Sequence, residues 1–160
     1  MIYVTVGTMY LDFARLIHEM DAIAEATQEQ VIVQTGMGTT LPKHCEHFDF
    51  KPREEVLAIQ REARVIVTHA GIGSVIDALQ AQRPAIFVPR LKRYGEHNND
   101  HQVDIASAME RRGWGRMILD MDELAGACAH PPAVHMDYRP DRERLISTIR
   151  TRIERSARAS

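Results

Sequence analysis

Short apolar runs alternate along the chain with longer stretches in which apolar residues recur every three or four positions. The apolar runs predict buried β-strands at 2–6, 31–34, 48–50, 65–68, 85–88 and 116–119. The periodic stretches predict helices at 11–26, 52–62, 73–82 and 100–112, and a short helix from Asp120 to Leu124. Wholly apolar strands that alternate with helices indicate a parallel sheet covered on both faces. We therefore expect a single Rossmann-like α/β domain, which binds ligands at the carboxyl ends of its strands.

The end of the chain differs from the rest. A Pro-containing linker at 130–139 leads to a predicted helix at 141–158, with Leu145, Ile149 and Ile153 spaced four apart. Residues 139–160 hold seven Arg and three acidic residues, a net charge of +4, so the remainder of a chain with net charge −2 carries −6. We divide the chain into a domain at 1–138 and a basic C-terminal helix at 139–160. That helix could dock on a partner, pack on its own domain or contact anionic lipid.

Composition excludes several classes of protein. The chain has 160 residues, of which 44% are hydrophobic and 26% charged, as in a soluble globular domain. A net charge of −2 argues against a nucleic-acid binder. Cys45 and Cys128 have no close Cys partner, which fits a reducing cytosol. With neither a signal-like start nor a run of about 18–20 apolar residues, we expect a cytoplasmic protein that reaches a membrane only through a partner.

Two glycine turns follow predicted strands. VTVGTMYLDF, at 4–13, carries Gly7 and Thr8 where a strand ends, and the free N–H groups of such a turn can receive a phosphate. An ordinary βα turn is the simpler interpretation of this motif taken alone.

The second turn, THAGIGSVIDAL at 68–79, is neither a dinucleotide fingerprint, which needs Gly at Ile76, nor a P-loop, which needs Gly-Lys-Ser/Thr. Gly71 and Gly73 permit close approach of a ligand, and the following helix start offers N–H groups to a pyrophosphate. Ser74 adds a hydroxyl donor, and Asp77 could accept from ribose hydroxyls. The alternative is a Ser-capped helix beside a buried His69.

A polar loop, PRLKRYGEHNNDHQ at 89–102, follows the strand at 85–88. Its residues 96–102 could hydrogen-bond the hydroxyls of a sugar. Three cations at its start could meet phosphate or an anionic group of the substrate: Arg90, Lys92 and Arg93. The alternatives are a solvated turn and a metal site, for which the chain offers His97 with His101, or His44 with Cys45 and His47.

Taken in order, these motifs together with VIVQTGMGTTLP and the stretch at 48–62 resemble the C-terminal, donor-binding half of GT-B glycosyltransferases of the family 28 type. The resemblance covers residues 1–118 and is greatest to a single-domain branch, which includes subunits of the dolichol-linked GlcNAc-transferase and of exopolysaccharide glycosyltransferases. It implies half of a GT-B fold, with the acceptor-binding half on a separate, membrane-anchored polypeptide.

The resemblance also implies roles for single positions. The first glycine loop would contribute Gly7 and Thr8, and the loop at 50–53, beginning with Phe50, would hold uracil largely through backbone groups. The diphosphate would be surrounded by His69, Ala70, Gly71, Gly73 and Ser74. The donor sugar would be faced by His101 and Gln102, assisted by Glu96 and Asn99. Asp77 stands where the family often has Glu for the ribose, and because Asp is one methylene shorter, a bridging water is the alternative to direct contact.

The implied activity is transfer of a sugar from a UDP-sugar to a lipid-linked acceptor in polysaccharide synthesis, without a cofactor or a metal. The catalytic base would lie in the partner, the protein would be peripheral at the inner membrane, and no nucleic acid would be bound. Two alternatives stay open: a non-catalytic UDP-sugar-binding regulatory module, and a stand-alone nucleotide-sugar enzyme such as an epimerase. The sugar also stays open among glucuronate, glucose, galactose and GlcNAc.

Overall fold

A six-stranded sheet forms the centre of the computed structural model, which describes residues 1–133. Its order is β3-β2-β1-β4-β5-β6, and all neighbouring strands are parallel. The strands are β1 (Ile2–Thr5), β2 (Val31–Gln34), β3 (Glu46–Phe48), β4 (Val65–Thr68), β5 (Ala85–Phe87) and β6 (Arg116–Met117). This architecture confirms the predicted Rossmann-like α/β fold.

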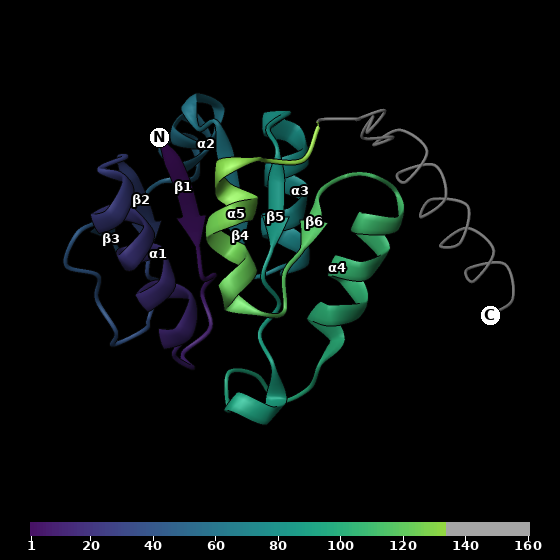
Figure 1. Ribbon diagram of the computed structural model, residues 1–160. Coiled ribbons are helices and arrows are strands. Elements are labelled where there is room, and N and C mark those ends of the chain that lie inside the picture. The colour runs from purple at the N-terminus through teal and green to yellow at the C-terminus, as the bar shows by residue number, and fades with distance from the viewer. Residues whose placement is uncertain (134–160) are drawn as a thin grey trace, which may run out of the picture.

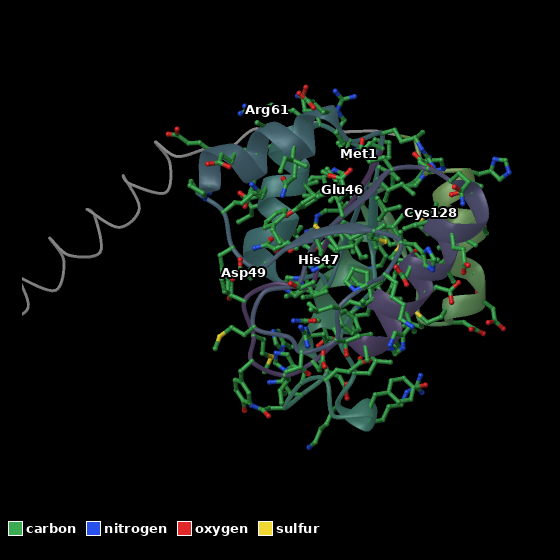
Figure 2. All side chains as sticks on the ribbon, turned by 90° about the vertical axis from the view of Figure 1, so that its left-hand side faces the viewer. Met1, Glu46, His47, Asp49, Arg61 and Cys128 are labelled. Atoms are coloured by element: carbon green, nitrogen blue, oxygen red, sulfur yellow. The ribbon has the colours of Figure 1, made fainter. Side chains whose placement is uncertain are left out.

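Helices cover both faces of the sheet (Figure 1). One face is covered by α1 (Ala14–Thr27) and α5 (Leu124–Ala129), and the other by α2 (Arg53–Glu62), α3 (Ile72–Ala81) and α4 (His101–Arg111). Seen from the β3 edge in Figure 2, Arg61 of α2 and Cys128 of α5 lie on opposite sides of the sheet. Alternation along β1 explains the two layers, because Ile2 and Val4 pack with α1 whereas Tyr3 packs on the opposite face.

The strand order reverses at β1. The chain runs outward from β1 to β2 and β3, and then returns so that β4 lies on the other side of β1. Thr5 is in register with both Gln34 and Thr68, so the three central strands end at the same level. In parallel α/β sheets such a switch point opens a crevice beyond the carboxyl ends of the strands.

The clearest differences from the sequence predictions concern short elements. β3 lies at 46–48 instead of 48–50, because pairing with β2 sets Gln34 opposite Phe48 and the chain then leaves the sheet to enter α2. The predicted short helix is a 3₁₀ turn, η2 (Met121–Glu123), in which the Asp120 side chain accepts from Asp122 N. The α-helix α5 follows that turn and was not predicted. A second 3₁₀ turn, η1 (Lys92–Tyr94), lies in the loop after β5.

The predicted helix at 141–158 and its docking role lie outside the described residues. Within residues 1–133, none of the helices is long and apolar enough to cross a membrane.

Candidate functional site

A cleft of about 400 Å³ opens beyond the carboxyl ends of the central strands. Its walls come from the loops after β1, β3 and β4 and from the first turns of α2 and α3. It is lined by Thr5, Gly7, Thr8, Gln34, Phe50, Lys51, Arg53, Val56, His69, Gly71, Ile72, Gly73, Ser74 and Asp77. The structure thus brings together, in one cleft, eight side chains or glycines predicted from the sequence: Gly7, Thr8, Phe50, His69, Gly71, Gly73, Ser74 and Asp77.

A hydrogen-bond network at the ends of β1 and β2 forms the floor of the cleft. Tyr3 Oη and Thr5 Oγ1 both donate to Gln34 Oε1 at 3.0 Å, and Thr5 Oγ1 accepts from Gly7 N at 3.2 Å. Burial raises the pKa of the Tyr3 hydroxyl to about 12, so it remains a donor. The sequence analysis did not select Thr5 or Gln34. Their signal was a polar residue at the last position of an otherwise apolar strand.

Three glycines allow the loops to close around the His69 ring. Gly7 has φ +82°, and a Cβ there would lie 2.6 Å from the His69 ring. A Cβ at Gly71 would lie 2.2 Å from His69 Nε2, and one at Gly36 would lie 2.2 Å from the Gly7 carbonyl oxygen. Any side chain at these positions would therefore force the loops apart.

His69 is buried and neutral. Its Nδ1 lies 3.3 Å from the Thr5 carbonyl oxygen, which can only accept, so this contact requires the proton on Nδ1. Burial, followed by the nearby positive charge of Arg90, lowers the pKa of the imidazole to about 4. His69 therefore contributes shape and one hydrogen bond to the cleft, with no charge at neutral pH.

The first turn of α3 faces the cleft with Ile72, Gly73 and Ser74. Gly71 caps this helix with extended geometry and no side-chain cap, and its carbonyl accepts from Val75 N at 2.9 Å. The first N–H groups of a helix have no intrahelical partner and carry the positive end of the dipole. Ala70, at φ +62°, makes the reversal between β4 and α3 and is itself buried below the cleft surface. A turn of this geometry leaves backbone N–H groups that could receive an anion.

Charged side chains occupy the wall contributed by α2 and α3. Arg53 Nη2 donates to Asp77 Oδ1 at 2.5 Å, so the pair joins the first turn of α2 to α3 across the cleft. Lys51 lies next to them, with its Nζ 3.4 Å from Glu55 Oε2. Phe50 is half-exposed at the same rim.

The polar loop after β5 is placed elsewhere. Glu96 is buried, where it accepts from Arg15 Nε at 2.7 Å and from Leu91 N at 2.9 Å. Gln102 is also buried and accepts from Arg90 N at 3.0 Å. Asn99 and His101 line a separate hollow of about 710 Å³ beside α4, together with Leu91, Arg93, Asp100, Val103, Asp104 and Leu119. The four residues predicted to contact the sugar therefore do not line the cleft in this structure.

The prediction that Arg90 meets a phosphate is wrong. Its guanidinium is fully buried and donates to the carbonyl oxygens of Val6, Leu11, Asp12 and Glu96 at 2.8–3.2 Å. Burial lowers the pKa of Arg90 to about 10, which leaves it charged at neutral pH. Arg90 thus ties the loop after β1 to the loop after β5.

The two groups considered as metal ligands stay incomplete. The His97 and His101 rings meet edge to face at 4.6 Å between centroids. Cys45 is buried with its Sγ at the Met20 carbonyl, whereas His44 and His47 are exposed. Among residues 1–133, no three His, Cys, Asp or Glu side chains gather closely enough to hold a metal ion.

The fold and the cleft define a Rossmann-like domain with a glycine-lined cleft at the switch point of its sheet. Residues 1–126 match the glycosyltransferase family 28 C-terminal domain, and the chain belongs to this family. The match confirms the resemblance inferred from the motifs.

Two curated relatives show how far the similarity extends. The UDP-N-acetylglucosamine transferase subunit ALG13 of Eremothecium gossypii is 39% identical over 84 residues, covering 51% of this chain and 38% of that protein. ALG13 of Mus musculus is 26% identical over 120 residues, covering 69% of this chain and 10% of that protein. The chain thus spans well under half of the length of either relative.

Solved glycosyltransferases share the fold. The structure of the glycotransferase of kitacinnamycin superposes with a TM-score of 0.61 at 20% identity, covering 80% of this chain and 33% of that one. The superposed part corresponds to about a third of that enzyme.

Proposed function

We propose that this chain is the donor-binding part of a glycosyltransferase that moves a sugar from a UDP-sugar to a lipid-linked acceptor in polysaccharide synthesis. Family membership supports the glycosyl-transfer class, and the name of the ALG13 relatives supports a UDP-sugar as donor. GlcNAc is the first sugar to test for that reason. The sugar, the acceptor and the pathway are parts of the proposal.

The observation that carries the proposal is the cleft between the first turns of α2 and α3. The α3 turn presents the N–H groups of a helix start, and two cations line the cleft beside it: Lys51, which pairs with Glu55, and Arg53, which pairs with Asp77. As the bond to the sugar breaks, UDP gains negative charge, which fixed N–H dipoles and cations stabilise without reorganisation. We propose that this arrangement replaces a metal ion, so transfer should persist in EDTA.

We propose further that a second, membrane-anchored polypeptide supplies the acceptor site and the catalytic base. Tyr10, Met37 and Leu41 are 66%, 59% and 56% exposed on loops beyond the carboxyl ends of β1 and β2. Asp12 holds these loops together, since its Oδ2 accepts from Thr40 N at 3.1 Å and from the Thr39 and Thr40 hydroxyls. An apolar rim beside a ligand cleft suits contact with another chain. Through this partner the protein would work at the cytoplasmic face of the inner membrane.

Binding of UDP is the first test. Titration calorimetry on the full chain with UDP and with a panel of UDP-sugars should show saturable one-to-one binding. Gly73→Ala is the sharpest variant, because a Cβ there meets no atom within 4 Å yet stands in the cleft. It should fold normally and lose UDP affinity. Gly126→Ala, also free of contacts within 4 Å but in α5, should retain it.

Transfer is the second test. Membranes of the organism that makes the protein supply the acceptor half, and radiolabel from UDP-GlcNAc or another UDP-sugar is followed into the lipid extract. Label that requires the added chain supports the proposal. If the chain binds UDP-sugars but no label moves with any donor, the enzyme hypothesis fails and the non-catalytic UDP-sugar-binding module is favoured. If no UDP compound binds, both fail.

A further inference from the structure

The Arg53–Asp77 pair lies in the nucleotide cleft with most of its hydrogen-bonding capacity unused. Within residues 1–133, the only hydrogen bond of each side chain is the one at 2.5 Å that joins them. The Arg53 side chain is 64% exposed, whereas Asp77 is 22% exposed. The carboxylate is thus mostly covered by the wall of the cleft, whereas the guanidinium is largely exposed at its lining.

Stability of the fold does not explain this pair. Ion pairs with so much solvent exposure contribute little to folding, because water competes for both charges and ordering a long side chain costs entropy. An arginine has five N–H donors in a planar fork, and Asp77 accepts from only one of its terminal nitrogens. The remaining donors are free to receive a ligand.

The charge of the wall favours an anion. Lys51, Arg53 and Asp77 line the cleft, whereas the Glu55 carboxylate that pairs with Lys51 at 3.4 Å does not, and the α3 turn adds the positive end of a helix dipole. An unpaired Asp77 would repel a phosphate. The pairing compensates the charge of Asp77 and holds the Arg53 guanidinium in the lining of the cleft.

We propose that Arg53 is a ligand-binding residue for the phosphates of the nucleotide, and that Asp77 is its positioning residue instead of a direct acceptor from the ribose. The inference rests on the proposed function, since it assumes that a UDP compound occupies the cleft. It assigns Arg53, at the end of the loop at 50–53, a side-chain role toward the phosphates, where contacts to uracil largely through backbone groups were expected.

A double-mutant cycle separates the two roles of Asp77. Titration calorimetry on the full chain would compare Asp77→Asn, Arg53→Gln and the double variant, with UDP and with 2′-deoxy-UDP as probes. Each single substitution should weaken UDP binding by about tenfold, as for loss of a charge-assisted hydrogen bond. The double variant should bind no more weakly than Arg53→Gln alone, and the affinity ratio of UDP to 2′-deoxy-UDP should stay the same in every variant.

Salt dependence and a matched control complete the test. The affinity of the unaltered chain for UDP should fall more steeply with NaCl than that of Arg53→Gln, because one cation–phosphate contact is missing in the variant. Arg116→Gln breaks the exposed 2.7 Å pair with Glu123 at β6, outside the cleft, and should leave UDP affinity unchanged. Unfolding midpoints verify that all variants are folded.

Three results would count against the proposal in different ways. Unchanged UDP affinity in Arg53→Gln overturns the role of Arg53. Asp77→Asn could instead lower UDP affinity by the same factor in the unaltered chain and in Arg53→Gln, and abolish the preference for UDP over 2′-deoxy-UDP. In that case Asp77 binds the ribose directly. If the unaltered chain binds no UDP at all, the proposed function itself fails.

Discussion

Acid should destabilise this protein through the buried ring of His69. In the folded chain the pKa of His69 is about 4, chiefly because burial disfavours the charged form. In the unfolded chain it returns to about 6.5. Between these two values the unfolded state binds a proton that the folded state does not, so folding stability falls as the pH falls. The contribution of the neutral His69 ring to folding stability is therefore fully present above pH 6.5 and lost below pH 4.

The size of the effect follows from the two pKa values. A difference of one pKa unit corresponds to 1.36 kcal/mol. From 6.5 to about 4 the loss is therefore about 3 kcal/mol, an appreciable share of the roughly 5–15 kcal/mol by which domains are stable. Asp12, Asp21 and Glu29, whose pKa values are lowered by hydrogen bonds or ion pairs, add their own acid sensitivity. A comparison of variants is therefore needed to isolate His69.

His69→Asn is the variant of choice, because the Asn amide can donate to the Thr5 carbonyl oxygen as His69 Nδ1 does. Urea unfolding from pH 7.5 to pH 4 should show the unaltered chain losing about 3 kcal/mol more than His69→Asn. His18→Asn, at an exposed position on α1, serves as control and should follow the unaltered chain. Parallel pH profiles for His69→Asn and the unaltered chain would refute the assignment of a buried neutral ring.

Three further substitutions test the packing behind the cleft by urea unfolding. Gly36→Ala should lower the free energy of unfolding by at least about 2 kcal/mol, because Gly36 has φ +59° and an added Cβ would lie 2.2 Å from a backbone oxygen. Gly126→Ala in α5 should leave the free energy of unfolding unchanged or raise it by up to about 1 kcal/mol. Equal effects of the two substitutions would contradict the close approach at Gly36. Arg90→Lys should lower the free energy of unfolding by about 2–4 kcal/mol, since a lysine cannot reach the four carbonyl oxygens together. A loss under about 0.5 kcal/mol would contradict the role of Arg90 in tying the loops together. Gln102→Ala should cost about 1–3 kcal/mol by leaving the buried Arg90 N–H without its acceptor, and unchanged stability would show that water replaces it.

Hydrophobic periodicity was sufficient to predict most of the fold. The strands at 31–34 and 65–68 have the predicted bounds, and the long helices differ by one to three residues. Those segments have a clear hydrophobic pattern because each helix buries one continuous face and each strand is a short apolar run. The helix α5 was missed because its six residues include Gly126 and three alanines, which give almost no hydrophobic periodicity. Its buried face becomes evident only from its packing against α1.

The glycine turns could be placed from the sequence because their chemistry is local. Gly7 and Gly71 follow apolar strands, and parallel strands bring their carboxyl ends to one edge of the sheet. Arg90 and Glu96 could not be placed in this way. An exposed and a buried arginine look alike in a sequence, and the acceptors of Arg90 lie up to 84 residues away on the loop after β1.

That misplacement indicates how the cleft is supported. Arg90 and Glu96 lie behind the loop after β1, where the guanidinium binds Val6, Leu11 and Asp12 from within the protein. The side of that loop which carries Gly7 and Thr8 faces the cleft and makes few contacts of its own beyond Thr5 and His69. Buried hydrogen bonds therefore hold the loop rigid from one side, so that its other side can present bare backbone to a ligand. On this proposal two arginines serve the cleft in different ways. Buried Arg90 shapes the loop after β1, and exposed Arg53 remains available to bind the ligand.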